Sequence, residues 1–188
     1  LRATQVLLED GIARPILIGR PSVIDQRIKR FGLSLDPEKD FEIINPEDDP
    51  RYRDYVSLFH SLVGRTGVTP DTARTIVRTN TTVIGALALK RGEADAMLCG
   101  LQGRFIKHVR DIKSVLGMQA GVTEASALSM LIMPRGAFFL TDTYVNQNPS
   151  ADEIVSITLQ ARDHLKRFNI EAKAALLSYS NFGSRDGD

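Results

Sequence analysis

The segment best suited to binding an anion covers residues 99–110, with the sequence CGLQGRFIKHVR. It follows an apolar run and opens a predicted helix, so Gly100 and Gly103 lie where the chain passes from strand to helix. Backbone N–H groups and the helix dipole favour phosphate-like anions at such a turn. Arg104 and Arg110 add positive charge, and one arginine can donate two hydrogen bonds to a phosphate. The alternative is an ordinary turn whose basic side chains face water.

A second candidate loop has the sequence SYSNFGS, at residues 178–184. Its small hydroxyl groups and its glycine would let the backbone approach a ligand closely. The loop is neither a Walker A motif, which ends in GK[ST], nor a GxGxxG motif, so an ordinary loop is the stronger alternative. The candidate ligand-binding residues here are Ser178, Ser180, Asn181, Gly183 and Ser184.

Two further residues could carry chemistry. Asp142 ends a predicted strand, where it could act as a base, but such a residue more often accepts hydrogen bonds from the following loop. Cys99 lies in an apolar run, and a nucleophilic cysteine needs an electropositive, partly exposed site. We therefore expect a structural role for Asp142 and a buried, unreactive thiol for Cys99.

No metal-binding or catalytic constellation is predicted. His60, His108 and His164 are far apart in the sequence and lack zinc-site spacing, so each is expected on a helix surface. The acidic residues 47–49 are explained more simply by the start of a helix. There is no G-x-S-x-G elbow, so no serine–histidine–aspartate site can be argued.

The elements that must position these loops follow from apolar periodicity and from Gly and Pro signals. Strands mostly alternate with helices, which predicts an α/β fold with a largely parallel sheet and helices on both faces. In such sheets ligands bind at the carboxyl ends of strands, where both candidate loops lie. Helices are predicted near 1–10, 21–31, 50–63, 70–78, 81–92, 104–116 and 150–168, and strands near 13–19, 41–45, 94–100, 126–134, 137–142 and 174–178.

Composition restricts the classes of function. The chain has 188 residues, 43% of them hydrophobic, a net charge of +1 and one cysteine, which excludes an internal disulfide. The mixed charges give no nucleic-acid-binding stripe and no membrane-binding face. No apolar run reaches the roughly 18 residues of a membrane span, so we expect a cytoplasmic protein. The sequence begins without Met and ends in a loop, and we expect it to be part of a longer chain.

Several segments together resemble the phosphate acetyl/butyryl transferase family along nearly the full length. They are GIARPILIG (11–19), GEADAMLCG (92–100), FFLTDTYVNQNP (138–149) and RFNIEAKAALLSYSNFGS (167–184). The segment INPEDDPRYRDY (44–55) is similar to the version of this domain fused to large bacterial NADP-dependent malic enzymes.

The resemblance implies two α/β lobes of the isocitrate and isopropylmalate dehydrogenase type, here 1–118 and an incomplete 119–188, with CoA bound between them. Arg110 stands ten positions after Gly100, where the transferases carry a phosphate-binding arginine. The SYS loop matches a loop near CoA. Bulky residues at 104–106 and Asn181, which replaces a usual threonine, depart from the transferase pattern. The family's catalytic residues fall beyond position 188, so none is predicted in this chain.

Three functions stay open at this point. The leading hypothesis is a regulatory region that binds acetyl-CoA as an allosteric effector, while NADP and a divalent metal bind the malic catalytic part of the same chain. The second is a working phosphate acetyltransferase. The third is an oligomerisation scaffold without a ligand, since domains of this family pair as dimers.

Overall fold

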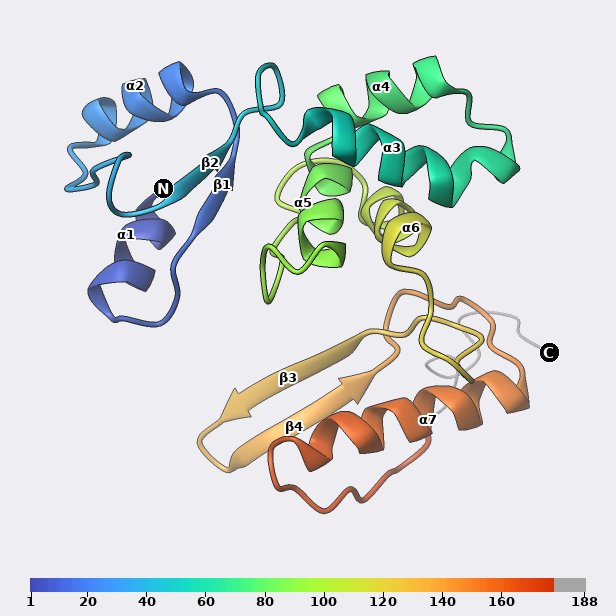
Figure 1. The fold of residues 1–188 in the computed structure, drawn as a ribbon. Coiled ribbons are helices and arrows are strands. Elements are labelled where there is room, and N and C mark those ends of the chain that lie inside the picture. Colours follow the sequence, from blue (N-terminus) through green and yellow to red (C-terminus); the bar gives the residue numbers. More distant parts are fainter. Residues whose placement is uncertain (178–188) are drawn as a thin grey trace. The chain divides into compact units, whose positions relative to one another are not determined.

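The computed structural model describes residues 1–177. The chain divides into two compact units, Leu1–Gly117 and Met118–Asp188 (Figure 1). Each unit is described by itself below.

The first part of unit 1 is a small α/β arrangement. α1 (Arg2–Glu9), β1 (Ile16–Ile18), α2 (Pro21–Phe31) and β2 (Glu42–Ile44) follow one another in the chain. β1 and β2 pair in parallel, with Ile16 opposite Glu42. Pro at the first position of α2 and left-handed Gly32 at its end fit the predicted helix limits. One face of α2 packs into a core formed by Ile24, Ile28, Leu35 and Phe41.

The second part of unit 1 is helical. α3 (Tyr52–Val63) is followed by a short 3-10 turn, α4 (Pro70–Thr79), α5 (Thr81–Lys90) and α6 (Phe105–Leu116). Every residue from 82 to 88 is buried, and α3, α4 and α6 all contact α5. α5 is therefore the central helix of this core, and its N-terminus is capped by the side chain of Asn80.

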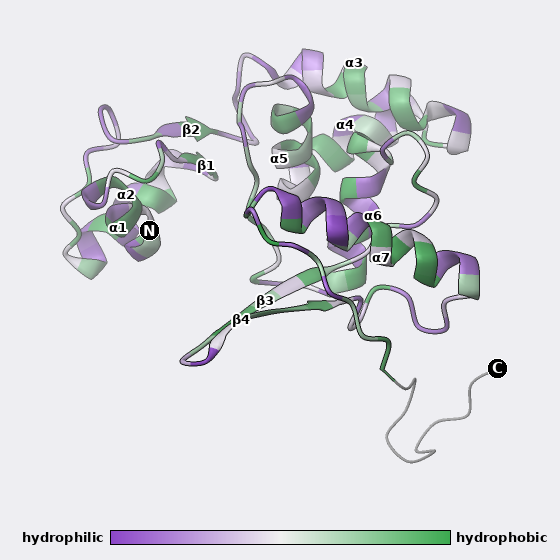
Figure 2. Cartoon of the chain, turned by 90° about the horizontal axis from the view of Figure 1, so that it is seen from below, coloured by the Kyte–Doolittle hydropathy of each residue, from purple (hydrophilic) through white to green (hydrophobic). Residues whose placement is uncertain are grey.

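Unit 2 contains one hairpin and one long helix. β3 (Leu128–Met133) and β4 (Gly136–Thr141) pair antiparallel, and α7 (Ala151–Lys166) follows. Figure 2 shows that both strands are strongly apolar. The ring of Phe139 lies 5.8 Å from that of Phe168, just past α7. The predicted capping box of Ser150 and Glu153 is confirmed, with both reciprocal hydrogen bonds present.

Several predicted elements differ from the structure. Residues 94–100 and 174–177 are not strands, because no described strand lies beside either segment to supply ladder hydrogen bonds. The four described strands form two separate pairs, one parallel and one antiparallel, in place of a single largely parallel sheet. α3 begins at Tyr52, so Asp49 and Pro50 precede the helix that they were expected to open.

Candidate functional site

The predicted anion-binding loop is a glycine-hinged turn that leads into α6. Gly100 and Gly103 have φ values of +104° and +102°, which side chains other than glycine rarely adopt. Arg104 is the extended N-cap residue of α6, and its carbonyl accepts hydrogen bonds from the amides of Lys107 and His108. The structure thus brings Gly100, Gly103 and Arg104 together in one loop at a helix N-terminus, as predicted.

His108 ties this loop to the buried helix α5. Its Nε2 atom lies 2.8 Å from the carbonyl oxygen of Gln102, and its Nδ1 atom lies 2.8 Å from Oγ1 of Thr82. Thr82 is buried in the first turn of α5. A Cβ atom on Gly103 would lie 3.1 Å from Nε2 of His108. The expectation of a plain surface histidine was therefore incomplete, because the imidazole is only partly exposed and bridges two elements.

A second polar contact joins α6 to α5. The amide Nδ2 of Asn80 donates to Oδ2 of Asp111 at 2.8 Å, and the same oxygen accepts from Nζ of Lys107 at 2.6 Å. Asn80 also accepts hydrogen bonds from the amides of Thr82 and Val83, which satisfies the start of α5. Lys107 is thus neutralised within α6 and is a poor candidate for holding an anion.

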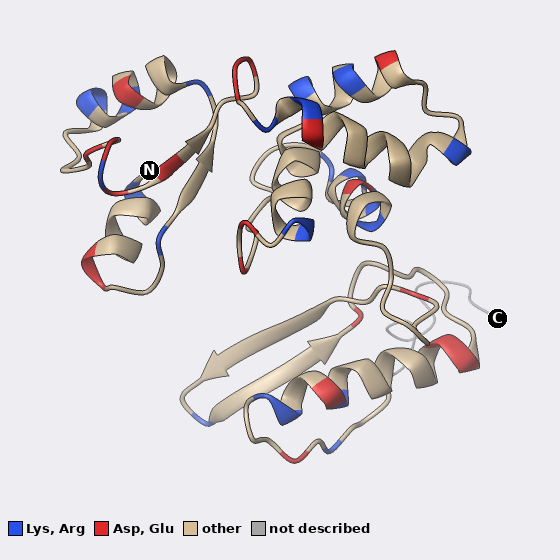
Figure 3. Ribbon diagram, viewed as in Figure 1, with Lys and Arg blue, Asp and Glu red and all other residues tan. Residues whose placement is uncertain are grey.

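Arg104 and Arg110 have no such partner. Both side chains are exposed, and neither forms an ion pair with another described residue. Figure 3 shows Lys and Arg in blue and Asp and Glu in red along α6. Arg104 caps the helix, whereas Arg110 lies six residues further along it, so the two guanidinium groups are not held together by any described contact. Their donors stay available to a ligand.

The prediction for Cys99 was wrong in its burial. Cys99 is exposed because the segment that carries it forms no strand. Desolvation by nearby atoms, together with the negative charge of Asp111, raises the pKa of the Cys99 thiol. A raised pKa lowers the thiolate fraction, so the expectation that this cysteine is not a nucleophile fits the structure.

The structural role predicted for Asp142 is confirmed. Its Oδ1 atom accepts a hydrogen bond from the amide of Ala127 at 2.9 Å. Its Oδ2 atom accepts from the backbone and side-chain nitrogens of Asn146, at 2.8 and 2.7 Å. All its hydrogen bonds fix the loop after β4 to the start of β3. The remaining predicted residues, Ser178, Ser180, Asn181, Gly183 and Ser184, lie outside the described residues.

The segment 44–55 forms an ion cluster centred on Arg51. The guanidinium donates to both carboxylate oxygens of Asp49, at 2.9 and 3.0 Å, and to Oε1 of Glu42 on β2 at 2.6 Å. The side chain of Asp49 is only 7% exposed. Burial alone would raise the pKa of Asp49, but the hydrogen bonds from Arg51 outweigh it and lower that pKa. This cluster fastens β2 to the start of α3.

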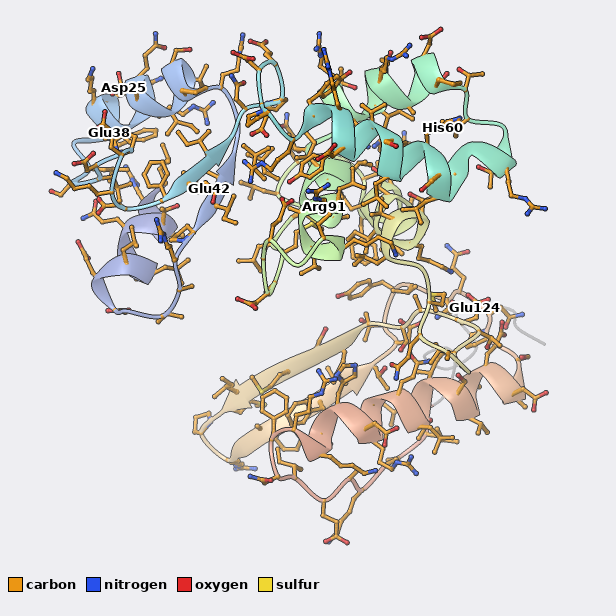
Figure 4. The ribbon with its side chains drawn as sticks, in the orientation of Figure 1. Asp25, Glu38, Glu42, His60, Arg91 and Glu124 are labelled. Carbon is orange, nitrogen blue, oxygen red and sulfur yellow. The ribbon has the colours of Figure 1, made fainter. Side chains whose placement is uncertain are left out.

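Tyr55 and Arg91 extend the cluster to the end of α5. The hydroxyl of buried Tyr55 donates to Glu93, whose other oxygen accepts from Nε of Arg91 at 2.5 Å. Burial, followed by the hydrogen bond to Glu93, raises the pKa of Tyr55 above its usual range. Figure 4 labels Glu42 and Arg91, which come from β2 and from the turn after α5. The sequence gave no signal for the contact between Tyr55 and Glu93, which are 38 positions apart.

Other features of the described residues do not suit an anion or a metal. An open concavity beside α2 is bordered by Asp25, Asp36 and Glu38, whose charges would repel phosphate (Figure 4 labels Asp25 and Glu38). Residues 1–177 contain no group of three or more His, Cys, Asp or Glu side chains placed to hold a metal ion. None of the described helices is both long and apolar enough to span a membrane.

Comparison with known proteins is consistent along the whole chain. The chain is 60% identical over 188 residues to the NAD-dependent malic enzyme of Rhizobium meliloti, covering 100% of this chain and 24% of that enzyme. It is 49% identical over 186 residues to the NADP-dependent malic enzyme of Haemophilus influenzae, covering 99% of this chain and 25% of that enzyme. A solved phosphotransacetylase from Streptococcus pyogenes superimposes with a TM-score of 0.82 at 24% identity, over 98% of this chain and 55% of that one.

These findings define an α/β protein with the phosphotransacetylase fold. Residues 1–188 match the phosphate acetyl/butaryl transferase family, and the chain belongs to that family, as the sequence segments indicated. The chain spans about a quarter of the length of the malic enzymes that it matches. Its relation to both malic enzymes and phosphotransacetylases is therefore confirmed.

Proposed function

We propose that this chain is the regulatory region of a malic enzyme and binds acetyl-CoA as an allosteric effector. The observation that carries the proposal is the 60% identity, across the entire chain, to a malic enzyme. The segment 44–55, on which the malic-type resemblance rests, packs as the Arg51 cluster. The proposed architecture of the complete domain is two lobes with a largely parallel sheet, in which the parallel pair of β1 and β2 would take part.

The proposed ligand contacts lie at the start of α6. CoA carries phosphate groups, and the loop with Gly100 and Gly103 presents a helix N-terminus beside the exposed cations Arg104 and Arg110. These groups suit a phosphate, and the loop 178–184 is proposed as a second part of the same site. Allostery requires that acetyl-CoA bind one state of the parent enzyme more tightly than another, which couples this site to the malate site.

The chemistry itself belongs to another part of the parent. Oxidative decarboxylation of malate to pyruvate needs a nicotinamide dinucleotide and a divalent metal. The described residues offer no metal cluster, so we assign both groups to the malic catalytic part of the same chain. We expected NADP, as in the Haemophilus influenzae relative, whereas the Rhizobium meliloti relative is NAD-dependent. We also propose that the parent works in the cytoplasm as a homo-oligomer.

The deciding experiment uses the full-length parent. Acetyl-CoA is titrated by calorimetry, and malate oxidation is assayed in parallel with NAD and with NADP. Saturable binding with a changed rate supports regulation. The absence of both, in the presence of active malate oxidation, would overturn it.

Two other functions have specific observations in their favour. The family match over residues 1–188 favours phosphate acetyltransfer, and the formation of acetyl phosphate from acetyl-CoA and phosphate by the parent would establish it. The apolar side chains of the hairpin, such as the 43%-exposed Leu131 and the 53%-exposed Phe138, favour an assembly role. Binding of no acyl-CoA by an oligomeric parent would favour that scaffold.

A further inference from the structure

We propose that His108 is a positioning residue that fixes the shape of the loop 99–104 for its anion. The role of the loop as a ligand site rests on the proposed function. The hold of His108 on the loop rests on geometry alone. The argument starts from the two hydrogen bonds of the imidazole, which join the loop to buried Thr82.

The hydrogen-bond partners fix the neutral form of the ring. The carbonyl oxygen of Gln102 can only accept, so Nε2 of His108 carries the hydrogen. Nδ1 is then the acceptor, and the hydroxyl of Thr82 donates to it. Thr82 is only 3% exposed and belongs to the central helix α5. The chain of donors runs from a rigid element, through His108, to the backbone of the loop.

This contact also orients the peptide between Gln102 and Gly103. The described chain has no cis peptide bond, so the N–H of Gly103 points opposite to the Gln102 carbonyl. Because that carbonyl faces His108, the N–H of Gly103 faces away from it, and no described residue accepts a hydrogen bond from this amide. The amide is thus pre-oriented for an acceptor outside the described chain, such as a phosphate oxygen.

Gly103 and His108 require one another. A Cβ atom at position 103 would lie 3.1 Å from Nε2, closer than almost all such contacts, and the φ of +102° is strained for any other residue. The imidazole therefore fills the space beneath the loop that a glycine leaves open. A ligand that met a loop without this support would have to order it on binding, which weakens affinity.

The test uses the full-length parent and four variants. His108→Ala removes both hydrogen bonds, His108→Gln keeps an amide donor for the Gln102 carbonyl, and Thr82→Val removes the anchoring hydroxyl at nearly constant volume. His60→Ala, on α3, is the matched control. Each protein is titrated with acetyl-CoA, and hydrogen exchange of the amides at 100–105 is measured by mass spectrometry.

We expect His108→Ala to bind acetyl-CoA about tenfold more weakly, the effect of losing one hydrogen bond worth about 1.4 kcal/mol. The loop amides should exchange faster in this variant, while the amides of α3 keep their protection and show that the core is folded. His108→Gln should restore most of both properties. Thr82→Val should weaken binding in the wild type but add little in the His108→Ala background, since the two residues act in one chain.

The outcomes separate the two proposals. Equal defects in His108→Gln and His108→Ala, or unchanged loop exchange in His108→Ala, would overturn the positioning role. If the wild-type parent binds no acetyl-CoA, the proposed function fails. The exchange measurement then still decides whether His108 holds the loop.

Discussion

Two arginine-containing regions of unit 1 use the same side chain in opposite ways. Arg51 is 22% exposed, and its donors are taken by the carboxylates of Asp49 and Glu42. Arg104 and Arg110, at the start of α6 and within it, are exposed and lack an acidic partner among the described residues. The difference shows that acidic neighbours decide whether an arginine supports the fold or stays available to a ligand.

Hydrogen-bond capacity gives the physical reason. A guanidinium has five N–H donors, and two carboxylates beside it leave few for any further acceptor. The Arg51 cluster is therefore a structural device, even though its segment carries the resemblance to malic enzymes. The exposed arginines retain their donors, and a phosphate is a planar-fork acceptor that suits them.

The largest expected effect comes from breaking the Arg51 cluster. Arg51→Met leaves the nearly buried carboxylate of Asp49 without its cation, which should destabilise the region by about 3 kcal/mol. Native-state hydrogen exchange of the α3 amides in the full-length parent would show the loss as faster exchange. Unchanged α3 protection would mean that the cluster contributes little to the fold.

The matching change in the other region should act on binding. Arg110→Ala removes a charge-assisted contact and should weaken acetyl-CoA binding by about 1.5–3 kcal/mol, with α3 protection intact. Arg78→Ala is the control, because Arg78 is an exposed arginine of α4 that stacks over Tyr52 at 4.8 Å. A calorimetric dissociation constant equal to that of the wild type would remove Arg110 from the site.

A smaller effect separates charge from hydrogen bonding in the cluster. Asp49→Asn should cost about 1 kcal/mol at neutral pH, since hydrogen bonds to a charged group are stronger than neutral ones. The pKa of Asp49 is lowered in the folded chain, so its stabilisation is present above the ordinary carboxyl value of 3.8 and is lost as pH falls through the lowered pKa. The difference between variant and wild type in α3 exchange should therefore shrink below pH 3.8. A difference that is constant with pH would contradict this account.

The smallest effect is expected from an arginine pair on the surface. Arg74 forms an ion pair with Asp71, but their side chains are 59% and 89% exposed. Arg74→Met should change local stability by less than about 0.5 kcal/mol, because water screens such pairs. Exchange of the α4 amides is the measurement. A loss as large as that of Arg51→Met would show that burial does not distinguish the two pairs.

The sequence by itself determined the local elements and the family. Every described helix was predicted within a few residues, because Pro70, Gly32 and the capping box of Ser150 mark helix limits through short-range chemistry. The hairpin followed from two apolar runs around a tight turn. The family followed from several segments read together. The glycines of the candidate loop were also visible, since a strand-to-helix turn needs their conformations.

Only the tertiary structure decided which side chains meet. Thr82 and His108 are 26 positions apart and Tyr55 and Glu93 are 38 apart, so no spacing rule predicts either contact. Periodicity identified 94–100 as an apolar run, but a strand also needs a neighbour for its ladder hydrogen bonds. The described residues supply none, which leaves Cys99 exposed against expectation. Local chemistry fixes helices and turns, whereas burial and hydrogen-bond partners depend on packing between distant segments.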